Sequence, residues 1–431
     1  MSYLIHLILA IIAFPVTVAT GYLGLLTLLS ARLPRPHPSR RDLCFDIIVP
    51  AHNETAVIER TVRSLAAIDW PRANFRILVI ADNCSDDTAD LARAAGAVVL
   101  ERHDEHHRGK GYALEYAIAR SAADGYAQAV AVIDADTEVT PNLLSAYAAR
   151  IEAGATVMQA HYGVLNPEDS WRTRLVTIAY GAFHAVRGRG RERLRASFGL
   201  RGNGMCMTHA LLREVPFNIH SMTEDLEYGI VLGLHGHRVV YVDEASADAE
   251  LIASEQGSRT QRQRWEGGRL TVVRAYTGRL LGQALRQPSW LCLELALDLL
   301  TLPLGYIVLQ TGALLVLGGL AALLLPGLGL WAWPLLGAVL LLVLVLHVLR
   351  GWQLSPLGPS ALLDLARAPF FVLWKLYIVL RNRGNKQWIK TDRDKGRNPG
   401  LNPGQHPGRN PGRTPVQNPQ QNQSQSRDQD Q

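Results

Sequence analysis

Two aspartates separated by one residue follow a short apolar run in residues 129–140, AVAVIDADTEVT. Continuous apolar runs of this kind are typical of strands covered on both faces, as in parallel α/β sheets. A buried strand is therefore predicted from Val130 to Ile133, with Asp134 and Asp136 on one side of the extended chain that follows. Two oxygen ligands this close favour a divalent cation with open positions for a phosphate. The alternative interpretation is a turn capped by aspartates.

Polar residues also follow two earlier predicted strands. The pair Asn53-Glu54 comes after the apolar run 45–49, and Asp82 comes after the run 75–80. Each of these side chains can accept a hydrogen bond from a nucleobase, or can simply cap a turn. Both interpretations stay open for Glu54 and for Asp82.

The loop 101–110, ERHDEHHRGK, combines three histidines with a lysine. His103, His106 and His107 suggest zinc, but the loop has no cysteine and no helical HExxH spacing, so a zinc site is disfavoured. Lys110 lies between two glycines just before a predicted helix, where it is well placed to meet phosphate oxygens.

Another acidic cluster is the segment 221–225, SMTED, which opens a helix predicted to end near Gly236. Ser221 and Glu224 match a capping box. The same pattern explains Asp225 only loosely, and a carboxylate at this point can instead take a proton from an attacking hydroxyl. Upstream, the glycines of 198–207, FGLRGNGMCM, indicate close approach of the backbone to a ligand or to another segment.

An amide, a guanidinium and an indole fall on one helical face in the sequence QRQRW. Gln261, Arg264 and Trp265 are related by i+3 and i+4 spacing. The guanidinium suits phosphate oxygens and the indole offers a flat stacking face, as a sugar phosphate requires. The alternative is an interfacial helix with Arg and Trp at lipid headgroups.

The elements that must position these groups alternate between strands and helices. Repeated βα units predict a mostly parallel sheet whose ligand lies at the carboxyl ends of its strands. The predicted strands are Phe45–Val49, Phe75–Ile80, Ala97–Leu100 and Val130–Ile133, and the predicted helices are Ala56–Ala67, a helix ending at Ala95, and Gly111–Ala123.

Apolar residues crowd both ends of the chain. Hydrophobic residues make up 48% of the 431 residues and charged residues only 19%. Tyr3–Leu29 is long enough to span a bilayer and lacks the features of a cleaved signal peptide. The basic segment Ser30–Asp42 that follows predicts a cytoplasmic linker, which places the N-terminus outside. The four cysteines show no disulfide-framework spacing, so free thiols in a reducing compartment are expected.

Further membrane segments are predicted after residue 290. Gln310–Leu325 and Leu328–Leu349 read as spans, and Ala361–Leu380 is a weaker candidate. Leu291–Val308 contains two acidic residues, so it is either a spanning helix facing other helices or an interfacial one. A chain that begins outside and ends in a basic cytoplasmic segment crosses an odd number of times, three or five.

These motifs occur in the order VPAHNE, Asp82, a DxD at Asp134–Asp136, TED at Thr223–Asp225, and QxxRW at Gln261–Trp265. This order resembles membrane-embedded family 2 glycosyltransferases, which include cellulose, hyaluronan and poly-N-acetylglucosamine synthases and related lipid glycosyltransferases. The resemblance covers about Phe45 to Arg269. It implies a GT-A (Rossmann-like) α/β domain inserted between N- and C-terminal transmembrane helices.

The resemblance also implies a role for each motif residue. Asp225 would be the general base. Asp82 would contact the uracil, Asp134 would lie near the ribose and diphosphate, and Asp136 would bind Mg2+ or Mn2+. Lys110 would approach the pyrophosphate, and Glu54 and Glu224 would also contact substrate. Gln261, Arg264 and Trp265 would hold the diphosphate and the acceptor sugar.

The activity implied by the resemblance is inverting transfer of a hexose or N-acetylhexosamine from a UDP-sugar to a growing polysaccharide. The alternative is a single addition to a lipid such as diacylglycerol or a polyprenyl phosphate, and a non-catalytic scaffold is disfavoured by the intact carboxylates. The implied partners are the donor, a glycan or lipid acceptor, membrane lipids and export or accessory proteins. Nucleic acid is not expected, because no aromatic-interleaved basic patch is present.

The implied setting is a bacterial inner membrane with the catalytic domain in the cytoplasm. The small membrane part and the lack of a regulatory domain after it weaken the comparison with processive secretion, and the segment 388–393, WIKTDR, resembles segments that reach back to the nucleotide. The tail 396–431 has a composition that cannot form a core. The expected organisation is an anchor (1–30), a basic linker (31–44), the GT-A domain (45–285), transmembrane or interfacial helices (286–382), a basic segment (383–395) and a disordered tail (396–431).

Overall fold

The computed structural model describes residues 2–251 and 255–368, with the side chains of residues 255–266 left out. Three predictions therefore lie outside the described residues: the basic segment 383–395, the segment WIKTDR and the tail 396–431. Most of the weaker span Ala361–Leu380 also lies outside them. Within the described part, its first residues form the short helix α14 (Ala361–Asp364).

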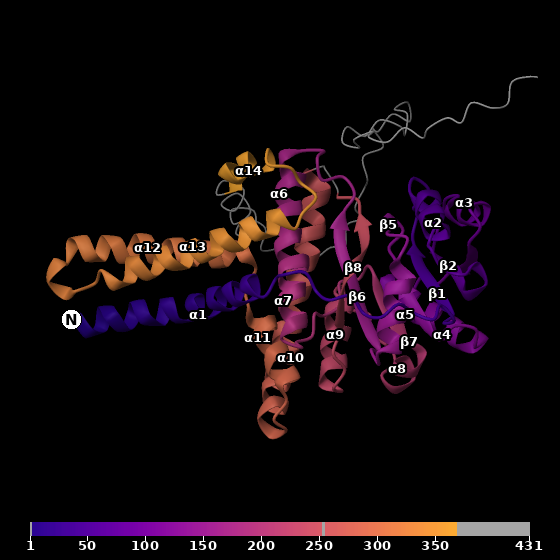
Figure 1. Ribbon diagram of the computed structural model, residues 1–431, viewed down its shortest axis with the longest axis horizontal. Coiled ribbons are helices and arrows are strands. Elements are labelled where there is room, and N and C mark those ends of the chain that lie inside the picture. Colours follow the sequence, from indigo (N-terminus) through magenta and orange to yellow (C-terminus); the bar gives the residue numbers. More distant parts are fainter. Residues whose placement is uncertain (1, 252–254, 369–431) are drawn as a thin grey trace, which may run out of the picture. The chain divides into compact units, whose positions relative to one another are not determined.

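An eight-stranded mixed sheet forms the centre of the chain, in the order β3-β2-β1-β4-β7-β6-β8-β5 (Figure 1). Strands β1, β2, β3 and β4 are mutually parallel neighbours, as predicted, with Phe45 of β1 opposite both Phe75 and Ala129. The strand bounds are β1 Phe45–Ala51, β2 Phe75–Asp82, β3 Val98–Arg102, β4 Ala129–Val132, β5 Thr137–Val139, β6 Val157–Val164, β7 Met205–Thr208 and β8 Val240–Ala249.

The other half of the sheet departs from the mostly parallel prediction. Strand β7 runs antiparallel to both β4 and β6, and β5 runs antiparallel to β8, while β6 and β8 are parallel. Strand β5 has three residues and β7 has four, and both are paired with neighbouring strands of the sheet. Such short strands have too few alternating positions to give a periodic signal in sequence.

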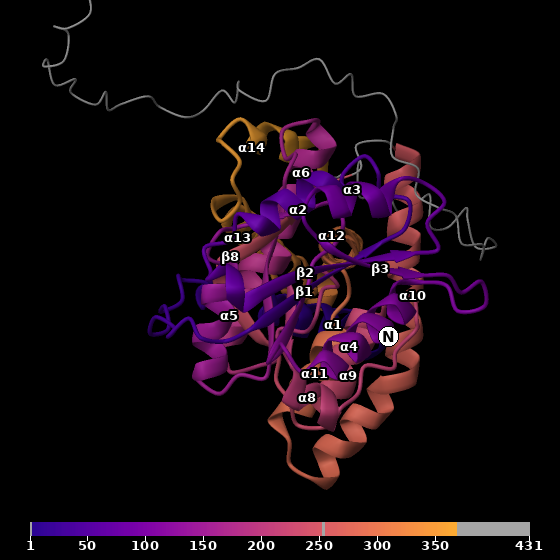
Figure 2. The same cartoon turned by 90° about the vertical axis from the view of Figure 1, so that its right-hand side faces the viewer.

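Helices cover both faces of the sheet (Figure 2). On one face, side chains of α2, α3 and α5 pack on Ile47 and Val49 of β1. On the other, those of α4, α8 and α9 pack on Ile48 and Val130. Alternate residues of β1 thus point to opposite cores, which is why the strand is apolar throughout. The helix bounds are α2 Ile58–Ala66, α3 Thr88–Ala94, α4 Lys110–Asp124, α5 Leu143–Glu152, α8 His209–Glu214 and α9 Glu224–Leu234.

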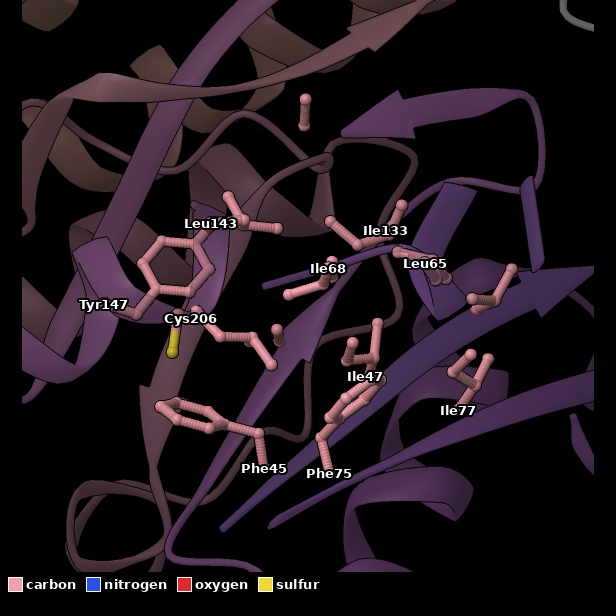
Figure 3. Packing of buried hydrophobic residues seen from close by; sticks show 14 of the residues in the cluster. Phe45, Ile47, Leu65, Ile68, Phe75, Ile77, Ile133, Leu143, Tyr147 and Cys206 are labelled. Carbon is pink, nitrogen blue, oxygen red and sulfur yellow. The ribbon is translucent and has the colours of Figure 1, made fainter. Parts of the chain in front are cut away.

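The core beneath α2 and α5 is dense around the central strands. Figure 3 shows Phe45, Ile47 and Phe75 among the buried side chains of this cluster. These three residues are at most 2% exposed. This packing fixes the carboxyl ends of β1, β2 and β4, from which the candidate site is built.

Three helices in the described residues are long and apolar enough to cross a membrane: α1, whose apolar part is Tyr3–Leu28, α12 (Leu304–Leu324) and α13 (Ala332–Gln353). They lie side by side in Figure 1 and share small buried clusters, such as Val16 with Leu314 and Leu340. Most of the weaker predicted span 361–380 lies outside the described residues, so the total of three or five spans stays a prediction.

The prediction of one helix over Leu291–Val308 is wrong. Helix α11 (Trp290–Leu300) ends before Pro303, and α12 begins at Leu304. Proline has no backbone N–H, so it cannot donate the hydrogen bond that would continue the helix. An 11-residue helix is about half the length that a bilayer core requires.

A helical segment between β6 and β7 connects the sheet with the apolar helices. It consists of α6 (Trp171–Tyr180), a π-helical stretch (Gly181–Val186) and α7 (Arg187–Arg193). A Cβ added to Gly181 would collide with the carbonyl oxygen of Gly351 in the last turn of α13. The π stretch therefore lies directly against the end of a candidate span.

Candidate active site

Four elements bring charged groups together at the carboxyl edge of the sheet. Lys110 begins α4, Asp134 follows β4, Gly202 precedes β7, and Asp225 lies in the first turn of α9. Lys110 Nζ donates to Asp134 Oδ1 and, at 2.7 Å, to the carbonyl of Gly202. A Cβ added to Gly202 would lie 3.2 Å from Asp225 Oδ2 and 3.5 Å from Lys110 Nζ. The structure thus brings together three of the residues predicted from separate motifs.

Gly202 fits this position for two reasons. Its φ is +77°, a left-handed conformation that costs other residues energy. Because glycine has no side chain, only its backbone lies between the ammonium of Lys110 and the carboxylate of Asp225. The indication from sequence that glycines at 198–207 permit a close backbone approach is confirmed for this glycine.

Burial disfavours the charged forms of two carboxyl groups here, Glu224 and Asp225. Burial, with the nearby Asp225 charge, raises the pKa of Glu224 to about 7, and burial also raises the pKa of Asp225. Burial opposes the charge on Lys110, but the carboxylates of Asp134 and Glu224 outweigh it and raise its pKa. A carboxyl group whose pKa lies near 7 is suited to proton transfer at physiological pH.

The expectation that Asp134 and Asp136 lie on an extended chain is wrong. Strand β4 ends at Val132, and the chain makes a turn at Ala135-Asp136 before β5. The backbone N–H of Thr137 closes this turn by donating to the Asp134 carbonyl at 3.2 Å. The two carboxylates are therefore placed by a turn and not by the two-residue repeat of a strand.

Asn203 holds this turn, and it was not among the predicted site residues. Its Oδ1 accepts from the Asp134 N–H at 3.1 Å and its Nδ2 donates to Thr137 Oγ1 at 3.0 Å. The side chain is fully buried. The only signal for it in sequence is its position between two glycines, because its partners are 66 to 69 residues away.

The chemistry of the donor set fits Mg2+ or Mn2+ shared with a diphosphate. Among the described residues no group of three or more His, Cys, Asp or Glu side chains is arranged to hold a metal. Asp134 is engaged by Lys110, and Asp136 follows it in the same turn. Mg2+ is commonly held by one or two carboxylates together with substrate phosphates and water.

The two residues predicted near the nucleobase lie at the ends of neighbouring strands: Asp82 is the last residue of β2, and Glu54 follows β1. Arg102 donates to Asp82 Oδ1 at 2.7 Å, so this carboxylate is paired within the protein, and the amide of Asn83 donates to the same oxygen at 3.1 Å. The backbone N–H of Glu54 donates to Thr88 Oγ1 at 2.8 Å. Both strand ends are thereby fixed in place.

The predicted capping box of Ser221 and Glu224 is wrong. Helix α9 begins at Glu224, its N-cap is Thr223, and no side chain caps it. The hydroxyl of Thr223 is buried without a hydrogen-bond partner in the described part of the chain. A Cβ added to Gly268 would collide with the Thr223 side chain, so the neighbouring helix α10 occupies the space next to this cap.

Helix α10 (Glu255–Arg286) carries the predicted residues Gln261, Arg264 and Trp265. The contact of Gly268 with Thr223 brings this helix to the start of α9, where Asp225 lies. The side chains of the three residues lie outside the described part of the structure. Only the helical backbone prediction is therefore confirmed for them.

An aromatic group not predicted from sequence lies beside the carboxylates. Tyr162 of β6 packs edge-on against Tyr180, with ring centroids 5.6 Å apart, and lies 5.3 Å from the ring of His184. Burial raises the pKa of Tyr162 well above its ordinary value, with contributions from the charges of Tyr180, Asp134 and other acidic residues. Tyr162 therefore lies close enough for the charges of Asp134 and Asp225 to act on it.

A pH-dependent stability follows from Glu224. Because its folded-state pKa of about 7 lies above the ordinary 4.5, its contribution to stability is complete below about pH 4.5 and is lost as the pH rises through 7. At roughly 1.4 kcal/mol for each pKa unit, the loss is about 3–4 kcal/mol. We expect the wild type to lose unfolding free energy relative to Glu224→Gln as the pH rises over this range. The measurement is denaturant titration of both proteins in detergent.

The control is Glu227→Gln in the same helix, where Glu227 accepts a hydrogen bond from Tyr276 at 2.7 Å. Glutamine keeps that acceptor. A Glu224→Gln difference that stays constant with pH would contradict the raised pKa of Glu224.

The chain resembles curated glycan synthases over about half of its length. It is 24% identical over 247 residues to the probable glucomannan 4-beta-mannosyltransferase 1 of Arabidopsis thaliana, covering 54% of this chain and 44% of that protein. It is 25% identical over 288 residues to the cellulose synthase catalytic subunit (UDP-forming) of Pseudomonas fluorescens strain SBW25, covering 61% and 37%. The chain thus spans less than half the length of these two relatives.

A solved structure of similar extent is the mannosyltransferase PcManGT from Pyrobaculum calidifontis, in complex with GDP-Man and Mn2+. The two chains share 17% sequence identity with a TM-score of 0.49, over 80% of this chain and 99% of that one.

The family described as "Glycosyltransferase like family 2" matches residues 42–268, just over half of the chain. The matched region includes every motif on which the resemblance was based, from VPAHNE to QxxRW. It also contains the whole mixed sheet. The chain therefore belongs to glycosyltransferase family 2, with a GT-A-like domain flanked by apolar helices.

Proposed function

We propose that this protein transfers a hexose or N-acetylhexosamine from a UDP-sugar to an acceptor hydroxyl, with inversion at the anomeric carbon. The observation that carries the proposal is the arrangement around Gly202. Lys110, which pairs with Asp134, contacts the Gly202 carbonyl, and Asp225 lies next to the Cα of the same glycine. This arrangement supports a phosphate-binding cation and a proton acceptor at one point. The names of the glucomannan and cellulose synthase relatives support a β-linked glycan as product.

The donor diphosphate meets Lys110 and Asp134 in this proposal. The ammonium of Lys110 lies at the amino end of α4, where helix N–H groups and the helix dipole also favour a phosphate. Asp82, oriented by Arg102, accepts a hydrogen bond from the uracil, and Glu54 lies in the adjoining loop. On α10, Gln261, Arg264 and Trp265 complete the contacts to the diphosphate and the acceptor sugar.

A divalent cation, Mg2+ or Mn2+, would be held by Asp136 together with the donor diphosphate. When bound, it neutralises the charge that grows on the diphosphate as the glycosidic bond breaks. Lys110 contributes to the same stabilisation from the protein side, and it is fixed in advance by Asp134 and the Gly202 carbonyl.

Asp225 is proposed as the general base. The acceptor oxygen forms a bond to the anomeric carbon, the bond from that carbon to the diphosphate breaks, and the hydroxyl proton passes to Asp225. The raised pKa of Asp225 makes it a stronger proton acceptor than an exposed aspartate. The departing diphosphate needs no proton, so one base is sufficient. Glu224, next to Asp225, holds a proton near neutrality and limits the negative charge of the pair.

The proposed setting follows from the helices around the domain. Three candidate spans support a membrane protein, and the basic linker after α1 supports a cytoplasmic catalytic domain in a bacterial inner membrane. The organisation expected from sequence, with the GT-A domain at 45–285 between an anchor and the later helices, is kept as part of this proposal.

A single addition to a membrane lipid is the second candidate. The observation that favours it is that α11 is too short to span and packs with α10 beside α9, leaving α1, α12 and α13 as the candidate spans of the described residues.

The catalytic role of Asp225 is testable by substitution with asparagine. We expect Asp225→Asn to lower the rate of sugar transfer about 10²–10⁴-fold, the usual contribution of a general base. Donor binding, measured by equilibrium dialysis with labelled UDP-sugar, should change little. Asp90→Asn is the control, because Asp90 also lies in the first turn of a helix but faces solvent. Near-normal turnover of correctly inserted Asp225→Asn would reject the role.

The packing at Gly202 predicts a separation of stability from activity. Gly202→Ala and Gly125→Ala both place alanine at a positive φ, +77° and +62°, so each should cost about 1–2 kcal/mol of stability. Only at Gly202 does the new methyl group contact Lys110 and Asp225, because nothing lies within 4 Å at Gly125. We expect transfer to fall at least about tenfold in Gly202→Ala alone. Equal activities of the two variants would contradict the proposed site.

The product and the metal can be tested together. Purified protein in detergent is incubated with radiolabelled UDP-glucose, UDP-N-acetylglucosamine or UDP-galactose, Mn2+ and membrane lipids. A polymer cleaved by a specific glycanase identifies a glycan synthase, and a chloroform-soluble product identifies a lipid acceptor. Exhaustive chelation should abolish transfer and added Mg2+ or Mn2+ should restore it. Transfer that persists after chelation would reject the metal, and no transfer from any donor would reject the function.

A further inference from the structure

Three buried nitrogen atoms around Phe183 have no hydrogen-bond partner within the described part of the chain. They are Nδ1 of His184 in the π stretch, Nε of Arg187 at the start of α7 and Nε of Arg201 in the loop before β7. His184 and Arg187 are 5% and 7% exposed. Buried donors in folded proteins are nearly always paired, so three in one place indicate a missing acceptor.

Arg201 is a cation without a carboxylate partner among the described residues. Its guanidinium lies 4.7 Å from the ring centroid of Phe183 and 4.9 Å from that of Phe198, and it donates to the Phe198 carbonyl at 2.8 Å. Burial lowers its pKa to about 10, partly opposed by the charge of Asp298. A cation held in this way costs stability unless an anion joins it.

The neighbouring arginine shows how the same fold satisfies a buried cation. Arg191 is fully buried and pairs with Glu294 and with Asp298, and it also donates to the Ser197 carbonyl and the Tyr22 hydroxyl. Arg187 uses the same Asp298 carboxylate.

Four arginines, Arg187, Arg191, Arg201 and Arg269, act on the carboxylate of Asp298. The other nearby carboxylates are those of Glu294, which pairs with Arg191, and Asp225, whose charge acts on Arg201. With four cations and three carboxylates the excess charge is positive. Arg269 donates to backbone carbonyls, and Arg201 has no ion pair among the described residues. An anionic ligand at this point would balance it.

This cluster lies between the proposed base and the ends of two candidate spans. The charge of Asp225 acts on Arg201, and the π stretch that carries His184 contacts Gly351 at the end of α13. A Cβ added to Gly190 of α7 would lie 2.8 Å from the carbonyl of Leu26, near the end of α1. A ligand that reaches Asp225 past Arg201 therefore comes from the ends of apolar helices, where lipid headgroups are found.

We propose that Arg201, with Arg187 and His184, binds the phosphate group of a membrane lipid whose headgroup hydroxyl is the first acceptor of the sugar. A guanidinium matches the geometry of phosphate oxygens, and a neutral histidine can donate the additional hydrogen bond. The proposal rests on the transferase function proposed above and specifies its acceptor. The headgroup oxygen forms the bond to the anomeric carbon, its proton passes to Asp225, and the nucleoside diphosphate leaves.

The test compares three acceptors that share a glycerol unit. Phosphatidylglycerol has a hydroxyl, a phosphate and lipid chains; diacylglycerol lacks the phosphate, and glycerol 3-phosphate lacks the chains. We expect Arg201→Met to raise KM for phosphatidylglycerol at least about tenfold, the size of a lost charge-assisted contact. The donor KM and the transfer to diacylglycerol should be unchanged. Arg72→Met is the matched control, since Arg72 also lies over a phenylalanine, 4.9 Å from the Phe75 ring, and donates to a backbone carbonyl, but at the surface.

A second measurement does not depend on turnover. Phosphatidylglycerol in dodecyl maltoside micelles should raise the unfolding temperature of the wild type but not of Arg201→Met. Without lipid, Arg201→Met should be at least as stable as the wild type, because an unpaired buried cation has been removed. Arg201→Lys keeps the positive charge but not the paired N–H donors of the guanidinium, so phosphatidylglycerol should raise its unfolding temperature by part of the wild-type amount.

The outcomes separate the two proposals. Absence of transfer by the wild type from every donor would reject the transferase function, while lipid-dependent stabilisation would still report on the phosphate site. Transfer with an unchanged phosphatidylglycerol KM in Arg201→Met would overturn the site. A raised donor KM would assign the cluster to the donor diphosphate, and equal use of glycerol 3-phosphate would assign it to a soluble phosphate; either would overturn the lipid proposal. A lowered unfolding temperature of Arg201→Met without lipid would show a structural arginine instead.

Discussion

The charged bridge from Asp134 through Lys110 to the Gly202 carbonyl is the interaction on which the candidate site depends. It joins the end of β4, the start of α4 and the loop before β7, and Gly202 also contacts Asp225 at the start of α9. Since each element is anchored in the sheet core, the charged groups are held in place before any substrate binds. Preorganisation of this kind avoids the cost of reorienting dipoles during the reaction.

Enclosing several carboxylates in one place is costly, and the chain offsets the cost in different ways on either side of the loop. On the α4 side, Lys110 accompanies Asp134, and the raised pKa of Glu224 limits the negative charge. On the α7 side, the excess charge is positive, and Arg201 has no carboxylate partner among the described residues. In the two proposals, the loop separates the donor diphosphate from a second anion, with Asp225 between them.

Coupling to the membrane arises from very close backbone contacts. Gly181 faces Gly351 and Gly190 faces Leu26, so the π stretch and α7 lie against the ends of α13 and α1 without intervening side chains. Arg191 adds a buried ionic contact from α7 to Tyr22 of α1 and to both acidic residues of α11. The helices that border the acceptor side are in this way part of the apolar bundle as well as of the catalytic domain.

The sequence by itself determined the βα half of the sheet, the three long apolar helices, the family and the residues Lys110, Asp134 and Asp225, because periodicity, apolar length and motif order are local properties. Only the tertiary structure decided what surrounds them. Asn203 holds the turn of Asp134 from 69 residues away, and α10 packs on Thr223 at the start of α9. Arg187 and Arg191 share Asp298, while Arg201 has no carboxylate partner among the described residues. Each of these depends on contacts between distant segments, and such contacts leave no periodic pattern in a single sequence.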